Sequence, residues 1–175
     1  TTTMHVSHNF EETLSVADRI GIIHQGVIQQ IGTPSEIFRR PVSEFVARFV
    51  RCENIFSGRT IERDGNAVVQ VGGAEFRAAA TPEGDVLFTI RPEEIEVSSG
   101  AAESEKIAVN TFTGKIERII DKGAVMKLYV DVGVSLSALV ARRAFIEEGY
   151  RQGSVVTIHF EPEAAHVIPG NTPAK

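Results

Sequence analysis

The sequence predicts a mainly β protein made of two small barrels of about five strands each, preceded by the remnant of an α/β unit. Short apolar runs broken by glycine, proline and charged residues dominate from residue 54 onward. The same region contains an internal repeat, because FSGR at 56–59 is echoed by FTGK at 112–115, and the segment 84–93 by 153–163. Each half spans roughly 45–60 residues, a length that suits one small barrel.

Length and composition indicate an ordinary globular protein. The 175 residues can form one core or two small ones, and 42% hydrophobic with 23% charged residues is typical of soluble proteins. The net charge of −5 argues against a nucleic-acid partner, because phosphate binding requires a basic surface. The sequence has no stretch of the roughly 18 apolar residues that a spanning helix needs, and its single cysteine, Cys52, fits a reducing compartment. We therefore expect a cytoplasmic protein.

The first fifty residues predict a strand, a helix, a β-hairpin and two further helices, in this order. A β-rich stretch at 1–7 precedes a helix N-cap that has an acidic residue three positions later. Residues 20–32 alternate as in a hairpin, and a Thr-Pro-Ser-Glu sequence then starts a helix. The residues that set these boundaries are Asn9, Glu12, Gln25, Gly26, Thr33, Pro34, Glu36, Pro41 and Ser43. This order is typical of the end of an α/β unit without its central strands, so we expect a piece of a larger protein.

Two stretches of this region carry a family resemblance: VSHNFEET at 6–13 and ADRIGIIHQGVIQQIGTPSEIFRRPVSEFVARFV at 17–50. Together they resemble the end of the nucleotide-binding domain of an ATP-binding-cassette (ABC) importer, so residues 1–51 would be the remnant of that domain. The resemblance implies that His8 is the switch histidine, which in the intact ATPase contacts the γ-phosphate of ATP and helps to hold the attacking water. It also implies ATP and Mg²⁺ as cofactors of the parent. The family usually has aspartate in place of Asn9, and asparagine still caps a helix.

The other parts of an ATPase site are missing from the sequence. It contains no G-x-x-x-x-G-K-[ST] phosphate cradle (Walker A), no acidic strand end for magnesium (Walker B) and no signature motif. We therefore expect this chain to be inactive as an ATPase alone and to bind no cofactor. His5 and His8 predict no metal site, because residues three apart on a strand face opposite sides and no third ligand is near.

Residues 52–170 contain the two predicted barrel halves, about 52–100 and 107–170. Alternating apolar and polar residues, turn glycines and closing prolines define their elements. These elements are a hairpin at 67–79, a strand at 86–91, a strand at 123–133, a strand that becomes a short helix over 136–149, and final strands at 154–162 and 166–168. On the strand at 123–133, the face with Met126 and Leu128 alternates with the face that carries Lys127, and one face is expected in the core.

The tail extends the family resemblance. The segments that carry it are FTGK at 112–115, GAVMKLYVDVG at 123–133, LVARRAFIEEG at 139–149 and HVI at 166–168. They look like the TOBE domain, with tandem OB-like or molybdate-binding-like (MOP-like) barrels, that follows these ATPases. The resemblance implies that the domain packs against its copy in a second subunit, as a homodimer. It also implies that transmembrane permease subunits hold the parent at the inner face of the cell membrane.

The second half is more similar to importers of molybdate, tungstate or sulfate than to sugar or polyamine importers. This resemblance implies a pocket for a tetrahedral oxyanion, for which paired arginines are suitable ligands. The candidate residues are Asn110, Thr111, Arg142 and Arg143.

Three departures from the family pattern count against this pocket. Ala144 replaces a serine, and Glu161 and Glu163 replace a lysine and a serine, so two carboxylates would repel the anion. The competing interpretation is that the arginines start a solvated helix and pair with Glu147 and Glu148.

The function that this sequence favours is the regulatory and dimerisation part of the ATP-binding subunit of an ABC importer for an oxyanion. Two alternatives remain: a free-standing domain that senses or stores an oxyanion, and the ATPase tail of a sugar, polyamine or iron importer. An oligonucleotide binder is disfavoured by the acidic charge and by the small number of rings for base stacking, with two tyrosines and no tryptophan.

Overall fold

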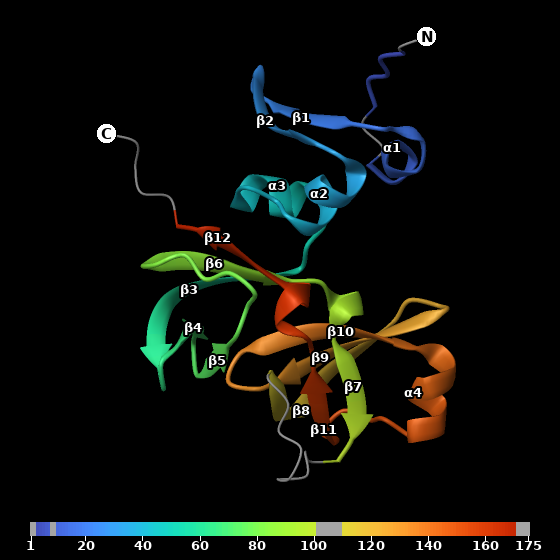
Figure 1. The fold of residues 1–175 in the computed structure, drawn as a ribbon. Coiled ribbons are helices and arrows are strands. Elements are labelled where there is room, and N and C mark those ends of the chain that lie inside the picture. Colours follow the sequence, from blue (N-terminus) through green and yellow to red (C-terminus); the bar gives the residue numbers. More distant parts are fainter. Residues whose placement is uncertain (1–2, 8–9, 101–109, 171–175) are drawn as a thin grey trace. The chain divides into compact units, whose positions relative to one another are not determined.

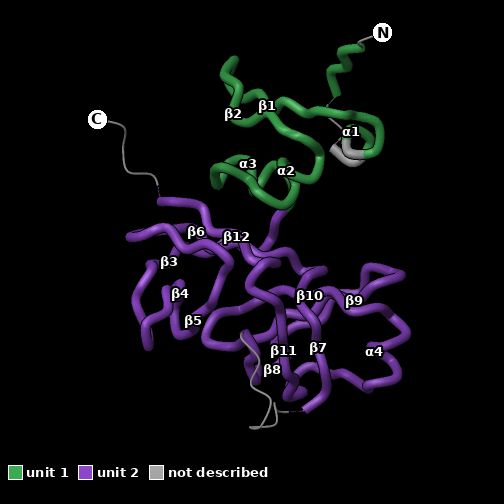
Figure 2. Tube along the Cα trace, viewed as in Figure 1, with its two compact units in different colours: residues 1–51 green, residues 52–175 purple. Residues whose placement is uncertain are grey.

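The structure, a computed structural model, describes residues 3–7, 10–100 and 110–170 (Figure 1). The chain divides into two compact units, residues 1–51 and residues 52–175 (Figure 2). Strands account for most of the regular structure, and the larger unit consists of two curled five-stranded sheets. The predicted class, a mainly β protein with tandem small barrels, is therefore confirmed.

The described part of the first unit, residues 3–7 and 10–51, contains a hairpin and three short helices. In chain order they are α1 (Phe10–Val16), β1 (Ile20–His24), β2 (Val27–Gly32), α2 (Pro34–Arg39) and α3 (Glu44–Phe49). Gln25 and Gly26 form the turn between β1 and β2 with φ angles of 48° and 78°, which a two-residue hairpin turn of type I′ requires. Thr33 and Glu36 close a capping box at the start of α2, with their side chains each accepting the other's backbone N–H.

The core of the first unit is small. Its buried members are Ile20, Ile22, Ile37, Val46 and Val50. Other apolar side chains of this unit are 52–76% exposed, among them Val16, Ile23, Val27, Ile28 and Ile31. Residues 3–7 are exposed and have no regular secondary structure, although the sequence predicts a strand there. A strand needs a partner, and in this unit β1 and β2 pair with each other.

In residues 52–100 and 110–170, the second unit is built from ten antiparallel strands in two sheets of the same internal order. The first sheet has the order β12-β6-β3-β4-β5, and the second has the order β7-β11-β8-β9-β10. The strands of the first half are β3 (Asn54–Arg63), β4 (Asn66–Val71), β5 (Ala74–Phe76), β6 (Asp85–Ile90) and β7 (Glu96–Ser99). Those of the second half are β8 (Thr111–Asp121), β9 (Val125–Asp131), β10 (Ser135–Ala141), β11 (Val155–His159) and β12 (Ala165–Pro169).

The two halves exchange their last strands. β7 belongs to the first half by sequence but pairs with β11, while β12 from the second half pairs with β6 (Figure 1). A short 3-10 helix precedes each exchanged strand, η1 (Pro92–Glu94) before β7 and η3 (Pro162–Ala164) before β12. Helix α4 (Arg142–Glu148) follows β10. The sheets therefore do not divide where the sequence halves do.

The repeated FSG and FTG sequences occupy equivalent positions, where one strand crosses closely over its neighbour. A Cβ atom on Gly58 of β3 would lie 2.6 Å from the carbonyl oxygen of Gln70 in β4. Likewise, a Cβ atom on Gly114 of β8 would lie 2.5 Å from the carbonyl oxygen of Asp131 in β9. Both distances are shorter than van der Waals contact, so only glycine fits. The internal repeat thus reflects a requirement of the backbone.

A single hydrophobic core joins both sheets. At its centre are rings from both halves, with Phe76 stacked on Phe88 at a centroid distance of 4.7 Å and edge-on to Phe112 at 5.2 Å. Phe160 lies 5.8 Å from the ring of Phe76. Because these rings come from four different segments, neither half can form this core alone.

Candidate functional site

Asn110 lies immediately before β8 and uses its side chain to hold another segment of the backbone. Its Oδ1 accepts the Arg77 N–H at 2.7 Å, and its Nδ2 donates to the Arg77 carbonyl oxygen at 2.9 Å. The residue is buried and has a φ of 56°, a conformation that asparagine tolerates better than most residues. Both ends of the amide are therefore engaged within the fold.

Thr111 is the first residue of β8 and belongs to a polar chain with His159 and Glu161. Its Oγ1 lies 3.0 Å from Nδ1 of His159, whose Nε2 lies 3.1 Å from Oε1 of Glu161. Glu161, one of the two carboxylates that the sequence places against an anion, thus has a histidine as its neighbour.

Arg142 and Arg143 start α4 and contact carboxylates. Arg142 Nη1 donates to both oxygens of Asp121 at 2.7 and 2.8 Å, and to the Gly123 carbonyl oxygen at 3.2 Å. The Gly123 N–H, followed by the Arg142 guanidinium, holds the pKa of Asp121 below its ordinary value. Arg143 is 87% exposed in its side chain and donates from Nε to Glu147 at 2.7 Å.

The candidate oxyanion residues fall into two pairs that are associated with opposite ends of β8. Thr111 begins β8 and Asp121, the partner of Arg142, ends it. An eleven-residue strand extends for roughly 35 Å when straight, and curvature shortens this only in part. Asn110 and Thr111 are therefore at one end of the second sheet, and the two arginines are at the other.

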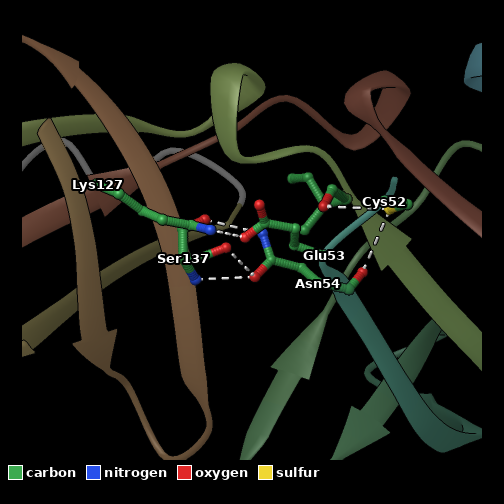
Figure 3. Close-up of polar contacts among 6 residues, drawn as sticks. Cys52, Glu53, Asn54, Lys127 and Ser137 are labelled. Atoms are coloured by element: carbon green, nitrogen blue, oxygen red, sulfur yellow. Dashed lines mark hydrogen bonds and ion pairs between the residues drawn. The ribbon is translucent and has the colours of Figure 1, made fainter. Parts of the chain in front are cut away.

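A polar cluster, which we call the junction cluster and which is buried apart from Glu53, lies where the second unit begins: Cys52, Glu53, Asn54, Lys127 and Ser137 (Figure 3). Asn54 Oδ1 accepts the Ser137 N–H at 2.8 Å and the Ser137 hydroxyl at 3.0 Å, while its Nδ2 donates to the Ser137 carbonyl oxygen at 2.8 Å. Its side chain therefore fastens the start of β3 to β10.

Lys127 forms an ion pair with Glu53 in the same cluster (Figure 3). Only 8% of the Lys127 side chain is exposed, against 45% for Glu53. Cys52 donates weakly from Sγ to the carbonyl oxygens of Asn54 at 3.7 Å and Ile90 at 3.8 Å, and burial raises the pKa of its thiol. A buried thiol of raised pKa is a poor nucleophile.

Asn54 and Asn110 are equivalent residues of the repeat, which extends to NIFSG at 54–58 and NTFTG at 110–114. Asn54, at the start of the first half, holds the backbone of Ser137 in the second half. Asn110, at the start of the second half, holds the backbone of Arg77 in the first half. The halves are thus joined by two reciprocal asparagine clamps, and an extended comparison of the two repeats could have found them.

The switch-histidine candidate, His8, lies outside the described residues, as does its neighbour Asn9. Across residues 3–7, 10–100 and 110–170, no three His, Cys, Asp or Glu side chains gather in a way that could hold a metal ion. In the same ranges no helix is both long and apolar enough to cross a membrane.

Part of the second unit matches a known domain family. Residues 88–168 match the family model described as the TOBE domain. This match begins inside β6 and ends inside β12, so it includes both exchanged strands.

The full chain, including the first unit, is related to the ATP-binding subunits of ABC importers. It is 37% identical over 169 residues to the molybdate/tungstate import ATP-binding protein WtpC of Pyrococcus horikoshii, and 33% identical over 168 residues to that of Pyrococcus abyssi. The alignments cover 96% and 95% of this chain and 47% of each relative. The chain thus spans about half the length of these curated relatives.

A solved structure has a similar fold. The cytoplasmic molybdate-binding protein ModG, with molybdate bound, superposes with a TM-score of 0.55 over 69% of this chain and 99% of its own. The sequence identity is 17%, so this likeness describes the fold alone.

Proposed function

We propose that this chain is the regulatory and dimerisation part of the ATP-binding subunit of an ABC importer, and that the imported solute is an oxyanion such as molybdate or tungstate. The observation that carries the proposal is the alignment with WtpC, because this one relative aligns with both units of the chain. A free-standing storage domain would need only the second unit.

The first unit supports the same proposal. Its apolar side chains Ile23, Val27, Ile28 and Ile31 are more than half exposed, which is unusual for a segment that folds by itself. In the parent, the remaining strands of the nucleotide-binding domain would cover them. His8 would act there as the switch histidine, and ATP and Mg²⁺ would be held by parts of the parent that this sequence lacks.

The parent would work at the inner face of the cell membrane, bound to its permease. Two copies of the chain would pair through their second units and bring two ATPase domains together. Because Asn110 and Thr111 are at the opposite end of β8 from the arginines, an anion that contacts all four residues would have to lie between two copies.

Isothermal titration tests the solute class. The purified chain is titrated at low salt with molybdate, tungstate and sulfate, together with a variant that carries both Arg142→Ala and Arg143→Ala. We expect a dissociation constant of about 1 µM or tighter for one anion, and its loss in the double variant. Arg63→Ala, which removes an arginine from an exposed ion pair with Glu75 far from α4 in the sequence, serves as the control.

Sedimentation velocity on the same samples tests dimerisation separately. If the chain sediments as a dimer but no anion gives heat in the titration, the proposed dimerisation role stands and the proposed oxyanion specificity is refuted. A monomer at high concentration would refute the dimerisation role.

A further inference from the structure

The junction cluster ties the boundary between the two units to the second sheet. Unit 1 ends at Arg51, and the next three residues each contact a different strand or strand end of unit 2. Cys52 contacts the Ile90 carbonyl at the end of β6, Glu53 pairs with Lys127 of β9, and Asn54 clamps Ser137 of β10 (Figure 3). β9 and β10 come more than seventy residues later in the chain.

Lys127 lies on the face of β9 opposite the core. Leu128 and Val130 belong to the hydrophobic core and Met126 is also buried, whereas Lys127 shares its face with Tyr129. A lysine there would ordinarily extend into water, yet only 8% of its side chain is exposed. Burial of a charge is unfavourable without a partner, and Glu53 supplies that partner.

We propose that the Glu53–Lys127 pair is a latch that fixes the path by which the chain leaves the second unit toward residues 1–51. With the latch closed, a shift of β9 or β10 moves residues 52–54 with it. The second sheet, and whatever binds to it, is thereby coupled to the first unit. The inference does not depend on the proposed function, because the contacts from which it is argued all lie within the second unit.

The two members of the latch are not equivalent, and this permits a clean test. Lys127→Met removes the buried charge, keeps most of the side-chain volume, and leaves Glu53 able to face water. Glu53→Gln instead leaves a buried ammonium without its counter-charge, so this variant is expected to destabilise the whole unit. Lys127→Met is therefore the informative substitution, and Arg63→Met, which breaks the exposed pair with Glu75, is its control.

Two measurements on the 175-residue chain decide the proposal. Amide hydrogen exchange is expected to be about tenfold faster or more at residues 52–54 in Lys127→Met, with unchanged rates in β11 and β12. Spin labels at Ser35→Cys in the first unit and Lys122→Cys in the second are expected to give a broader distance distribution. Arg63→Met should change neither quantity.

An unchanged exchange rate at residues 52–54 would overturn the latch. So would faster exchange spread evenly over the second unit, because this would indicate general destabilisation. An unchanged distance distribution would overturn the coupling between the units.

Discussion

At the scale of single residues, two asparagines hold backbone segments together, and the sequence alone assigns one of them, Asn110, to anion binding. Asn110 is a candidate anion ligand by resemblance, but its amide is paired on both sides with the backbone of Arg77. Asn54 makes the same kind of contact with Ser137. A side-chain amide carries an NH2 donor group beside an acceptor oxygen, so it can pair with the C=O and the N–H of one backbone residue as a neighbouring strand does.

Replacement of Asn110 should separate the hydrogen bonds of the clamp from its backbone conformation. Asn110→Gly keeps the positive φ and loses both hydrogen bonds, so we expect a loss of about 1–2 kcal/mol in the free energy of unfolding. Asn110→Ala should cost about 1 kcal/mol more, because alanine is strained at this φ. Urea unfolding measures both. Asn66→Ala, on an exposed side chain, is the control, and equal stability of Asn110→Gly and the wild type would refute the clamp.

The lowered pKa of Asp121 leads to a prediction of how stability depends on pH. Its pKa is lowered in the folded state, so its contribution to stability is present above its ordinary pKa of 3.8 and is lost as the pH falls through the lower folded value. Arg142→Ala should raise the pKa of Asp121 toward 3.8 without restoring it fully, since the Gly123 N–H remains. Carboxyl NMR titration measures this shift, and an unchanged pKa would show that Arg142 does not contact Asp121 in solution.

At the scale of elements, local patterns predicted most of the strands and turns. The hairpin at 67–79 forms as β4 and β5, and the segment 136–149 changes from strand to helix as its sequence indicates. The repeat could also be recognised in the sequence, because its glycines are required where the backbones of neighbouring strands are in close contact. The strand exchange could not be predicted. β7 and β12 are both short and have similar patterns, so the sequence of either strand is compatible with pairing to β6 or to β11.

Gly114 gives the element-scale prediction. Gly114→Ala places a methyl group 2.5 Å from the Asp131 carbonyl oxygen, so β8 and β9 must separate, and we expect a loss of about 2–3 kcal/mol. Gly73→Ala is the matched control, because the added Cβ would make ordinary contacts at 3.5 Å and the φ of Gly73 is not positive. Chemical denaturation of the two variants compares them directly. Equal stabilities would mean that the crossing can relax without cost.

At the scale of the whole molecule, long-range contacts account for what the sequence could not predict. Lys127 is buried and forms an ion pair with Glu53, which comes more than seventy positions earlier in the chain. The candidate arginines are far from Asn110 and Thr111 because β8 is one long strand with a pair at each end. Neither fact leaves a local pattern, since both depend on which distant segments meet.

The shared core predicts that the second unit unfolds as a single cooperative system. Val167→Ala, in β12 of the first sheet, should cost about 1–3 kcal/mol. Tyr129 and Tyr150 are in the second half, so their near-ultraviolet circular dichroism should show the same shift in midpoint as the far-ultraviolet signal. A tyrosine signal that keeps the wild-type midpoint would show that the two sheets melt independently.

The exchange of β7 and β12 also sets an order of events during synthesis. The first sheet needs β12 beside β6, although about eighty residues separate the two strands along the chain. In a nascent chain that has left the ribosome only as far as β6, one edge of β6 is therefore unpaired, because β12 has not yet been synthesised. This unpaired edge is a site for contact with chaperones or with neighbouring chains, until residues 165–169 emerge and β12 completes the first sheet.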